Sequence, residues 1–175
     1  MKTSPQQHAV LHPDPDSLRD VLRFWTSGVT IVAVKLGGMT HGMTVNSFTS
    51  LSLKPALVSI SLEKVTRTHG LVQKAGAFAV SILSQDQRAL SDRFAGRETE
   101  ANDRFDGVEI FSLETGSPIL SEGLAFFDCR VAAMHDAGTH TLFYGEVLAA
   151  GLPSLGKTQE PLVYFNRNYR RLSDS

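Results

Sequence analysis

The sequence predicts a mainly β protein, with its strands in an antiparallel barrel and its helices at the periphery. Most strand-like segments follow one another along the chain, whereas a doubly wound parallel sheet requires strands and helices to alternate strictly. The length of 175 residues and the hydrophobic content of 42% suit one domain with a sizeable core. The sequence contains neither an internal repeat nor an interdomain linker.

The N-terminal part is expected to contain a flexible arm and one helix. Residues 1–16 hold three prolines and little apolar content, which predicts an arm before a single domain at 17–175. The Ser-x-x-acidic pattern at 17–20 predicts the start of a helix, and Gly28 can end this helix in a left-handed conformation. Trp25 belongs to this helix and is expected to lie in the core.

Two strand signals follow, with a polar stretch between them. The β-branched residues at 28–36 predict one strand, and the alternation of apolar residues at 56–63 predicts a second, half-buried one. Between them, residues 42–53 read GMTVNSFTSLSL, in which six of the twelve are Thr, Ser or Asn. These short polar side chains could be solvated, could satisfy one another, or could face a polar ligand held against the sheet.

Capping residues next predict two helices around a strand. Thr66 and Gly76 bound a short helix, RTHGLVQKA, and residues 77–83 form the strand after it. A Ser-x-x-Gln capping box at 84–87 predicts a second helix that ends near Phe94.

The C-terminal half is expected to be β again, after a polar loop at 95–107. Its strand-like segments are VEIFSL (108–113), GLAFFDCRVAAM (123–134), HTLFYGEVLAA (140–150) and PLVYF (161–165). The residues HDAGTH between the second and third of these segments are expected to form a hairpin loop, and NRNYRRL forms a basic tail.

The composition argues against several classes of function. With 17 Lys and Arg against 18 Asp and Glu, the net charge of -1 provides no electrostatic footprint for nucleic acid. The single Cys129 excludes an intramolecular disulfide and Cys-rich zinc sites, suits a cytoplasmic protein, and is expected to be a small buried hydrophobe. The six histidines lack a metal-ligand spacing, and neither an export signal nor a membrane span is expected.

One motif in the sequence is misleading. GLPSLGKT, at 151–158, matches the phosphate-loop pattern G-x-x-x-x-G-K-[ST]. The motif requires a helix after it, but Pro161 follows almost at once and only 17 residues remain beyond Thr158. We therefore interpret this segment as a surface loop.

The polar residues suggest a ligand with two parts. Hydroxyls at 44–52, with Ser59 and Ser61, suit the hydrogen-bonding edge of a flat ring. The helix start that follows carries Arg67 between two threonines, which suits a phosphate. A ring and a phosphate bound this close together describe flavin mononucleotide. The alternative is a hydroxyl-rich sheet with an ordinary capped helix, and composition alone favours it.

The chain also resembles a known family. The resembling segments are GVTIV (28–32), GMTVNSFTSLSLKPALVSISL (42–62), TRT (66–68), GAFAVSIL (76–83), DRFAG (92–96), GTHTLFYGEV (138–147) and PLVYFNRNYRRL (161–172). In this order they resemble the flavin reductase family of the FMN-binding split barrel, the reductase components of two-component flavin monooxygenases. The resemblance implies a six-stranded antiparallel split β-barrel, a homodimer and a partner monooxygenase. It also implies an NAD(P)H:flavin oxidoreductase that uses FMN or FAD with NADH or NADPH.

The resemblance further implies three groups of site residues. The isoalloxazine ring would be lined by Thr44, Val45, Asn46 and Ser47, with Ser59 and Ser61 nearby. The phosphate would be held by Thr66, Arg67 and Thr68. The nicotinamide would meet His140, the candidate catalytic residue, with Tyr169 and Arg170 covering it.

Three departures from the family pattern and two rival functions remain. Thr139 stands where the family often has Asp, which leaves the charge of His140 open; Asn46 replaces a common Ser, and Ala56 replaces a proline. The main rival is a non-catalytic flavin- or haem-binding split barrel used for storage or sensing. The other is an enzyme similar to pyridoxamine-phosphate oxidases, which the segments quoted above disfavour.

Overall fold

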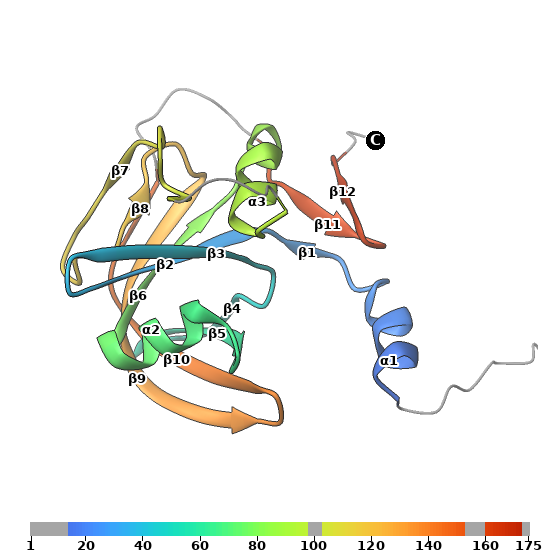
Figure 1. Ribbon diagram of the computed structural model, residues 1–175, viewed down its shortest axis with the longest axis horizontal. Coiled ribbons are helices and arrows are strands. Elements are labelled where there is room, and N and C mark those ends of the chain that lie inside the picture. Colours follow the sequence, from blue (N-terminus) through green and yellow to red (C-terminus); the bar gives the residue numbers. More distant parts are fainter. Residues whose placement is uncertain (1–13, 98–102, 153–159, 173–175) are drawn as a thin grey trace, which may run out of the picture.

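The computed structural model describes residues 14–97, 103–152 and 160–172. Seven antiparallel strands curve into a barrel (Figure 1). Their order in the sheet is β3 (Met39–Val45), β2 (Thr30–Leu36), β6 (Ala77–Ile82), β9 (Ala125–Ala137), β10 (His140–Gly151), β5 (Ala56–Glu63) and β4 (Thr49–Leu53). The sheet has one strand more than the six expected, because the polar stretch before β5 itself forms β4.

The barrel is split between its edge strands, β3 and β4. Ser47 lies between them and bonds to the backbone of β5. Its Oγ donates to the carbonyl of Ser61 at 2.8 Å and accepts the N–H of the same residue at 3.0 Å. One hydroxyl thus takes the place of two ladder bonds, and it accounts for part of the polar stretch before β5.

The barrel core forms where the predicted alternation places it. On β5, Val58, Ile60 and Leu62 are buried, as expected for a half-buried strand. They pack with Phe78, Phe143 and the buried Cys129. The burial of Cys129 in this core confirms the expected small buried group, and burial, followed by the charge of Asp128, raises the pKa of its thiol to about 12.

Helix α2 (Arg67–Ala75) covers one opening of the barrel. Its bounds agree with the prediction: the Thr66 hydroxyl accepts the N–H of His69, and Gly76 ends the helix at φ 64°. The capping box at Ser84 is also present, but it starts a short 3-10 turn, η1 (Gln85–Gln87). Helix α3 (Arg88–Phe94) follows directly.

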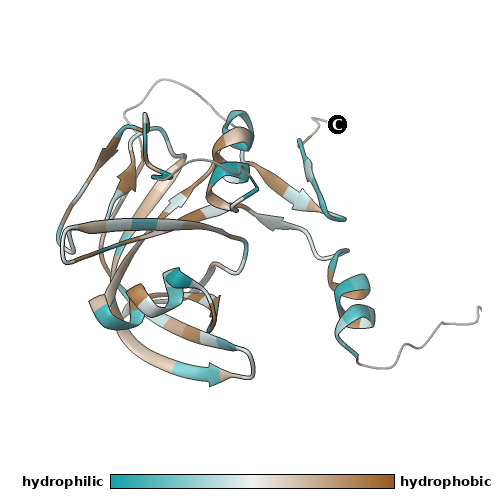
Figure 2. Cartoon of the chain, in the orientation of Figure 1, coloured by the Kyte–Doolittle hydropathy of each residue, from teal (hydrophilic) through white to brown (hydrophobic). Residues whose placement is uncertain are grey.

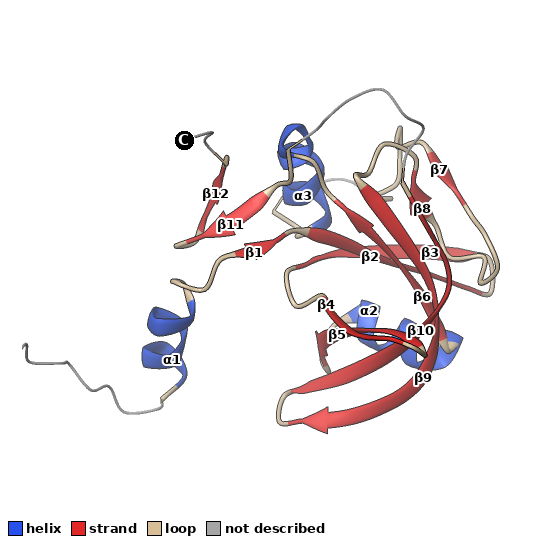
Figure 3. Cartoon of the chain, turned by 180° about the vertical axis from the view of Figure 1, so that it is seen from behind, coloured by secondary structure: helices blue, strands red, loops and turns tan. Residues whose placement is uncertain are grey.

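A second core lies on the outer face of β2, under α3. Phe94 and Phe105 pack edge to face there, at 4.9 Å between ring centroids, with Val29, Ile31 and Leu162. Two small sheets flank this region (Figure 3). One joins β1 (Ser27–Gly28), β11 (Val163–Phe165) and β12 (Asn168–Arg170), and the other pairs β7 (Ile110–Phe111) with β8 (Ile119–Leu120).

Helix α1 (Pro15–Leu22) corrects three expectations. It begins at Pro15 because the Asp14 carboxylate accepts the N–H groups of Asp16 and Ser17, so residues 14–16 do not belong to an arm. It ends before Gly28. Trp25 is 77% exposed and is not part of the core, because the helix stands away from the barrel (Figures 1 and 2).

The remaining differences concern loops. β9 and β10 continue to Ala137 and His140, so the predicted hairpin loop shrinks to a two-residue turn in which Gly138 has φ 61°. The predicted strand at 108–113 is reduced to the two residues of β7. Most of the phosphate-loop pattern lies outside the described residues. In the described ranges, no helix is long and apolar enough to cross a membrane.

Candidate functional site

Two clefts lie along β3, one toward each end of the strand. The first, of about 440 Å³, is here called the basic cleft. Its lining comes from the start of β3, the first turn of α2 and the segment before Val108: Gly38, Met39, Thr40, His41, Arg67, Asp103, Arg104 and Phe105. The second, of about 200 Å³, is here called the tyrosine cleft, and it is lined by Val29, Thr44, Asn46, Ala95, Arg97, Tyr164 and Tyr169.

The basic cleft holds two guanidinium groups. Arg104 Nη1 donates to the carbonyls of Gly42 and Phe94, both at 2.9 Å, and Arg67 Nη2 contacts Met39 Sδ at 2.6 Å. Within the described ranges, neither arginine has a carboxylate within ion-pair distance. Asp103 is the acidic residue among the described lining residues, and it forms no ion pair with either arginine in the described ranges, so this part of the cleft is net positive.

The electrostatics of this cleft act on His41. Burial, and then the charges of Arg104 and Arg67, lower the pKa of His41 to about 4, against a smaller opposing effect of Asp103. The pKa of Arg104 is also lowered, by burial first and by Arg67 second. His41 is thus neutral near pH 7, and the cleft has its positive charge on the two arginines.

The three residues predicted to bind phosphate have different environments at the start of α2. Thr66 is committed to the helix cap, since its hydroxyl also donates to the carbonyl of Glu63 at 2.7 Å. Arg67 lines the basic cleft. Thr68 is 1% exposed, and its Oγ1 has no hydrogen-bond partner in the described structure. An unpaired hydroxyl beside the free amides of a helix start fits an added anionic acceptor such as phosphate.

The tyrosine cleft brings together two of the predicted ring-binding residues and one of the predicted covering residues. Thr44 Oγ1 donates to the carbonyl of Ser91 at 2.6 Å, and Asn46 is exposed beside it. The Tyr169 hydroxyl lies 2.8 Å from Ser91 Oγ and 3.1 Å from Asp92 Oδ1. This network fixes the Tyr169 ring as one wall of the cleft.

The sequence did not single out Arg97, which also lines the tyrosine cleft. Its guanidinium lies 5.8 Å from the centroid of the Tyr169 ring and forms an ion pair of 2.8 Å with Asp92. The pKa of Tyr169 is raised, and burial is the largest cause. No local pattern marks Arg97, because its place depends on how α3 packs against β12.

Other predicted ring-binding residues form the barrel wall. Val45 and Ser59 are buried, and Ser47 is bonded to Ser61. None of these four side chains lines either cleft. Much of the hydroxyl content in this region therefore makes hydrogen bonds within the protein.

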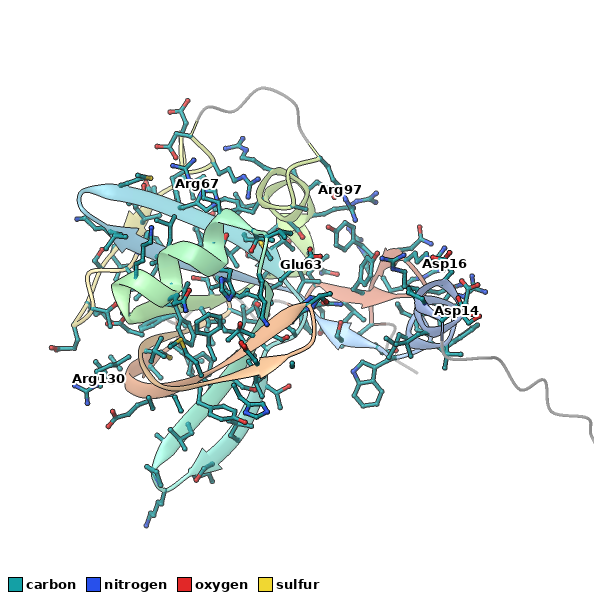
Figure 4. The ribbon with its side chains drawn as sticks, turned by 60° about the horizontal axis from the view of Figure 1, so that its bottom comes forward. Asp14, Asp16, Glu63, Arg67, Arg97 and Arg130 are labelled. Carbon is teal, nitrogen blue, oxygen red and sulfur yellow. The ribbon has the colours of Figure 1, made fainter. Side chains whose placement is uncertain are left out.

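His140 lines neither cleft. It begins β10, pairs with Glu63 of β5, and its Nδ1 lies 2.9 Å from the Thr139 hydroxyl. The Lys64 N–H donates to the Thr139 carbonyl at 3.0 Å, which ties the hairpin turn to the segment leading into α2. Figure 4 shows Glu63 at this junction and Arg67 toward β3.

Arg170 lies apart from both clefts. It is exposed on β12 and lines a third cleft, of about 300 Å³, with Asp86, Arg88 and Arg171. Its neighbour Tyr169 also borders this groove, and the Tyr169 hydroxyl bonds toward α3. Across the described ranges, no group of three His, Cys, Asp or Glu side chains is placed to hold a metal ion.

Comparison with known proteins identifies the family. Residues 22–173 match the model of the flavin reductase like domain. The chain is 38% identical to the reductase component of 4-hydroxyphenylacetate 3-monooxygenase from Thermus thermophilus, over 90% of this chain and 96% of the relative. It is 40% identical to the FMN reductase (NADH) SmoA from Agrobacterium fabrum, over 90% of this chain and 86% of the relative.

A solved structure agrees with these matches. The NADH:FAD oxidoreductase SgcE6 of Streptomyces globisporus superposes with a TM-score of 0.87 at 33% identity, and the match covers 97% of this chain and 100% of the other. The same enzyme has also been solved with NAD and FAD fragments. The split-barrel prediction is confirmed by this fold, and the chain belongs to the flavin reductase-like domain family.

Proposed function

We propose that this protein is an NAD(P)H-dependent flavin reductase. It transfers hydride from NADH or NADPH to FMN or FAD and supplies the reduced flavin to a partner monooxygenase. The observation that carries the proposal is the pair of clefts along β3, inside a chain that matches flavin reductases over nearly its whole length. One cleft has aromatic and amide groups suited to a polar ring, and the other has two arginines that form no ion pair within the described ranges and suit phosphate.

The residues of β3 and α2 have complementary roles in binding flavin. Thr44 and Asn46 meet the polar edge of the ring, near the backbone of Val45 and Ser47. Arg67 pairs with the phosphate, aided by the unpaired hydroxyl of Thr68. Thr66 contributes indirectly, because its cap orients the free amides of the first turn. Ser59 and Ser61 lie in the barrel wall on β5, and their proposed role is to support the flavin-binding residues indirectly.

The chain needs little acid-base chemistry for this reaction. Bound flavin and nicotinamide supply the hydride transfer themselves. The protein has to hold the two rings in contact, at about 3–3.5 Å, and stabilise the negative charge that develops on the flavin. Backbone amides and hydroxyls at the end of β3 suit this second task.

His140 is the proposed contact for the nicotinamide. His140 follows Gly138 and Thr139 in the hairpin turn and has no bulky neighbours in the sequence. The hydrogen bond from the Lys64 N–H to the Thr139 carbonyl holds this turn near the start of α2. Tyr169, which lines the tyrosine cleft, and Arg170, which lies outside both clefts, are proposed to cover the nicotinamide from β12. In one subunit His140 lies outside both clefts, so this role requires a second subunit or a ligand that extends beyond them.

A homodimer is supported by the apolar surface that one chain leaves uncovered. Large apolar side chains on and after α1 are each more than half exposed: Leu18, Val21, Leu22, Phe24 and Trp25. Leu18, Val21 and Leu22 recur at helical spacing and so share one face of α1, and exposed apolar surface of this kind marks protein interfaces. A second copy of the chain is the proposed occupant, because His140, which is assigned to the nicotinamide, lies outside the clefts assigned to the flavin within a single subunit.

A partner monooxygenase and a cytoplasmic location complete the proposal. The relatives include reductase components and subunits of monooxygenases, such as that of 4-hydroxyphenylacetate 3-monooxygenase. The unpaired, buried Cys129 suits a reducing compartment.

Steady-state oxidation of NADH and NADPH, each with FMN and with FAD, tests the proposed function. Flavin-dependent oxidation in at least one of the four combinations is expected. Flavin binding without oxidation would instead favour the storage or sensing protein. If the protein neither bound flavin nor oxidised NADH or NADPH, both proposed functions would be rejected.

A further inference from the structure

We infer that His69 is a positioning residue for His140: through the hydroxyl of Thr141, it fixes the β9–β10 hairpin on the start of α2. The inference rests on the proposed function, because it takes His140 as the contact for the nicotinamide. His69 itself lines neither the basic cleft nor the tyrosine cleft and is assigned no contact with a ligand.

A series of side-chain contacts joins α2, β10 and β9 near the hairpin turn. His69, on the first turn of α2, places Nε2 2.9 Å from Thr141 Oγ1 on β10. The Thr141 hydroxyl donates to Asp136 Oδ1 on β9 at 3.3 Å, and Asp136 Oδ2 lies 3.3 Å from Lys64 Nζ. Lys64 lies just before α2, so the contacts form a closed ring between the start of the helix and the hairpin.

The direction of these hydrogen bonds follows from the protons available. A threonine hydroxyl has one hydrogen, and that of Thr141 is directed to the Asp136 carboxylate. His69 must therefore donate, which places the proton of its neutral ring on Nε2. The pKa of His69 is lowered, by burial first and by the charge of Lys64 second, against the opposing effect of Asp136, so the ring is neutral near pH 7.

Burial makes the contact between His69 and Thr141 the strongest part of this series. His69 is 6% exposed and Thr141 is 5% exposed, so either group would be left buried and unpaired without the other. The His69 ring also packs edge to face on Phe143, at 5.3 Å between ring centroids, which restricts its orientation. The ion pair of Asp136 with Lys64 is more exposed and contributes less.

His140 depends on this contact because it is the neighbour of Thr141 at the start of β10. It pairs with Glu63, which lies where the hairpin meets the start of α2 (Figure 4). The Nδ1 atom of His140 lies 2.9 Å from the Thr139 hydroxyl, so the imidazole contacts the turn itself. A shift of the turn would carry the imidazole with it, and reaction rates are sensitive to displacements of about 1 Å.

Kinetic measurements on matched variants test this inference. His69→Leu removes the donor but keeps an apolar side chain of moderate size, and it should raise the KM for the nicotinamide or slow flavin reduction about fivefold. His69→Gln keeps an amide donor and should restore much of the loss. The flavin affinity should change less than the nicotinamide kinetics in both variants.

A double-mutant cycle separates positioning from a general structural role. If His69 acts through His140, His69→Leu should have little further effect on nicotinamide kinetics in a protein that already carries His140→Ala. Ser81→Ala is the control, because it removes another buried hydrogen bond, from the N–H of Leu120 at 3.1 Å. Ser81 pairs with Phe126, at the opposite end of β9 from the hairpin. The control should lower stability against urea and leave the nicotinamide kinetics unchanged.

NMR of the ligand-free protein gives a result that does not depend on activity. The His69 ring should carry its proton on Nε2. His69→Leu should shift the signals of the His140 imidazole, and His69→Gln should leave them near their original positions. Thr141→Val removes the hydroxyl in a side chain of nearly the same shape, and it replaces His69→Leu in every measurement if that variant does not fold.

Four results would overturn the inference. The first two are unchanged nicotinamide kinetics in His69→Leu and unshifted signals of His140 in the same variant. The third is an additive effect of His69→Leu and His140→Ala. The fourth is a general effect, seen as an equal fall in flavin affinity or as an equal change of kinetics in Ser81→Ala, which would mean that His69 supports the fold as a whole.

Each of these results can occur while the unmodified protein oxidises NADH or NADPH, so the inference can fail while the proposed function stands. Absence of oxidation by the unmodified protein would reject the proposed function. The NMR comparison would then still decide whether His69 positions the His140 imidazole.

Discussion

Ser47 and Ser61 share two hydrogen bonds through a single side chain: the Ser47 hydroxyl meets both the carbonyl and the N–H of Ser61. These bonds join the end of β3 to β5 across the split in the barrel. The residue that a ligand-based interpretation assigns to the flavin edge therefore also has a structural role.

Ser47→Ala should destabilise the protein. The substitution leaves an N–H and a carbonyl of β5 without their partner, which costs about 1–3 kcal/mol of unfolding free energy. Urea denaturation measures this loss. Ser50→Ala is the matched control, because Ser50 is exposed on the neighbouring β4; a similar loss in both variants would show that the Ser47 bonds have no special role.

Arg67→Ala should weaken FMN by about tenfold or more, because a hydrogen bond to a charged group contributes roughly 1.5–3 kcal/mol. Riboflavin, which has no phosphate, should be nearly indifferent to the change. Fluorescence titration with both ligands measures the difference. An equal loss for the two would mean that Arg67 supports the fold and does not touch the ligand.

His140→Ala should affect the nicotinamide and leave the flavin alone. Loss of one neutral hydrogen bond costs about 0.5–1.5 kcal/mol. This corresponds to a several-fold rise in KM for NADH or to a several-fold slower flavin reduction. Stopped-flow reduction at saturating flavin measures both. His135→Ala is the control, since His135 is exposed on β9 of the same hairpin. An unchanged rate with unchanged NADH dependence would remove His140 from the site.

Val21→Asp on α1 should weaken the proposed dimer. Val21 is 56% exposed in one chain, so the substitution costs little in an isolated subunit but buries a charge in an apolar interface. Sedimentation should shift from dimer toward monomer, and the emission of Trp25 should move to longer wavelength. Gln73→Asp, at an exposed position of α2, should change neither. A chain that sediments as a monomer before any substitution contradicts the proposal directly.

His41 should make stability depend on pH. Its pKa is about 4 in the folded protein against 6.5 for an unperturbed histidine, so between these values the unfolded chain binds the proton and the folded chain does not. Stability therefore falls as the pH drops from about 6.5 to about 4, and Arg67 and Arg104 strengthen this effect while Asp103 opposes it.

His41→Gln should flatten that part of the stability curve, as measured by urea unfolding at several pH values. The buried His69, whose pKa is also lowered, remains in both proteins and cancels in the comparison. Pyrophosphate in the basic cleft should also reduce the slope, because an anion beside the imidazole favours its charged form. Parallel curves for the two proteins would show that His41 titrates alike in the folded and unfolded chains.

Local chemistry accounts for what the sequence predicted well. Thr66 and Gly76 mark α2 correctly because a cap and a left-handed glycine act within one turn of the chain. The alternation on β5 likewise needs only a buried face. Trp25 was misplaced because its environment depends on where α1 lies relative to the barrel, which no periodicity reveals.

The site was predicted less completely for the same reason. Thr44, Asn46, Arg67 and Tyr169 do line clefts, since they stand in segments that resemble the family. Arg97 and Arg104 were not singled out, because neither belongs to a helix or strand whose pattern could be read from the sequence, and their places in the clefts depend on packing near α3.

The two clefts lie toward opposite ends of β3. Its backbone sets the distance between the two clefts, and the rise per residue of a strand is nearly constant. One residue inserted between Thr40 and Thr44 would both lengthen that distance and turn every later side chain to the opposite face. Members of this fold that adapt to flavins of different length are therefore expected to change side chains at the two ends of the strand and to keep its number of residues.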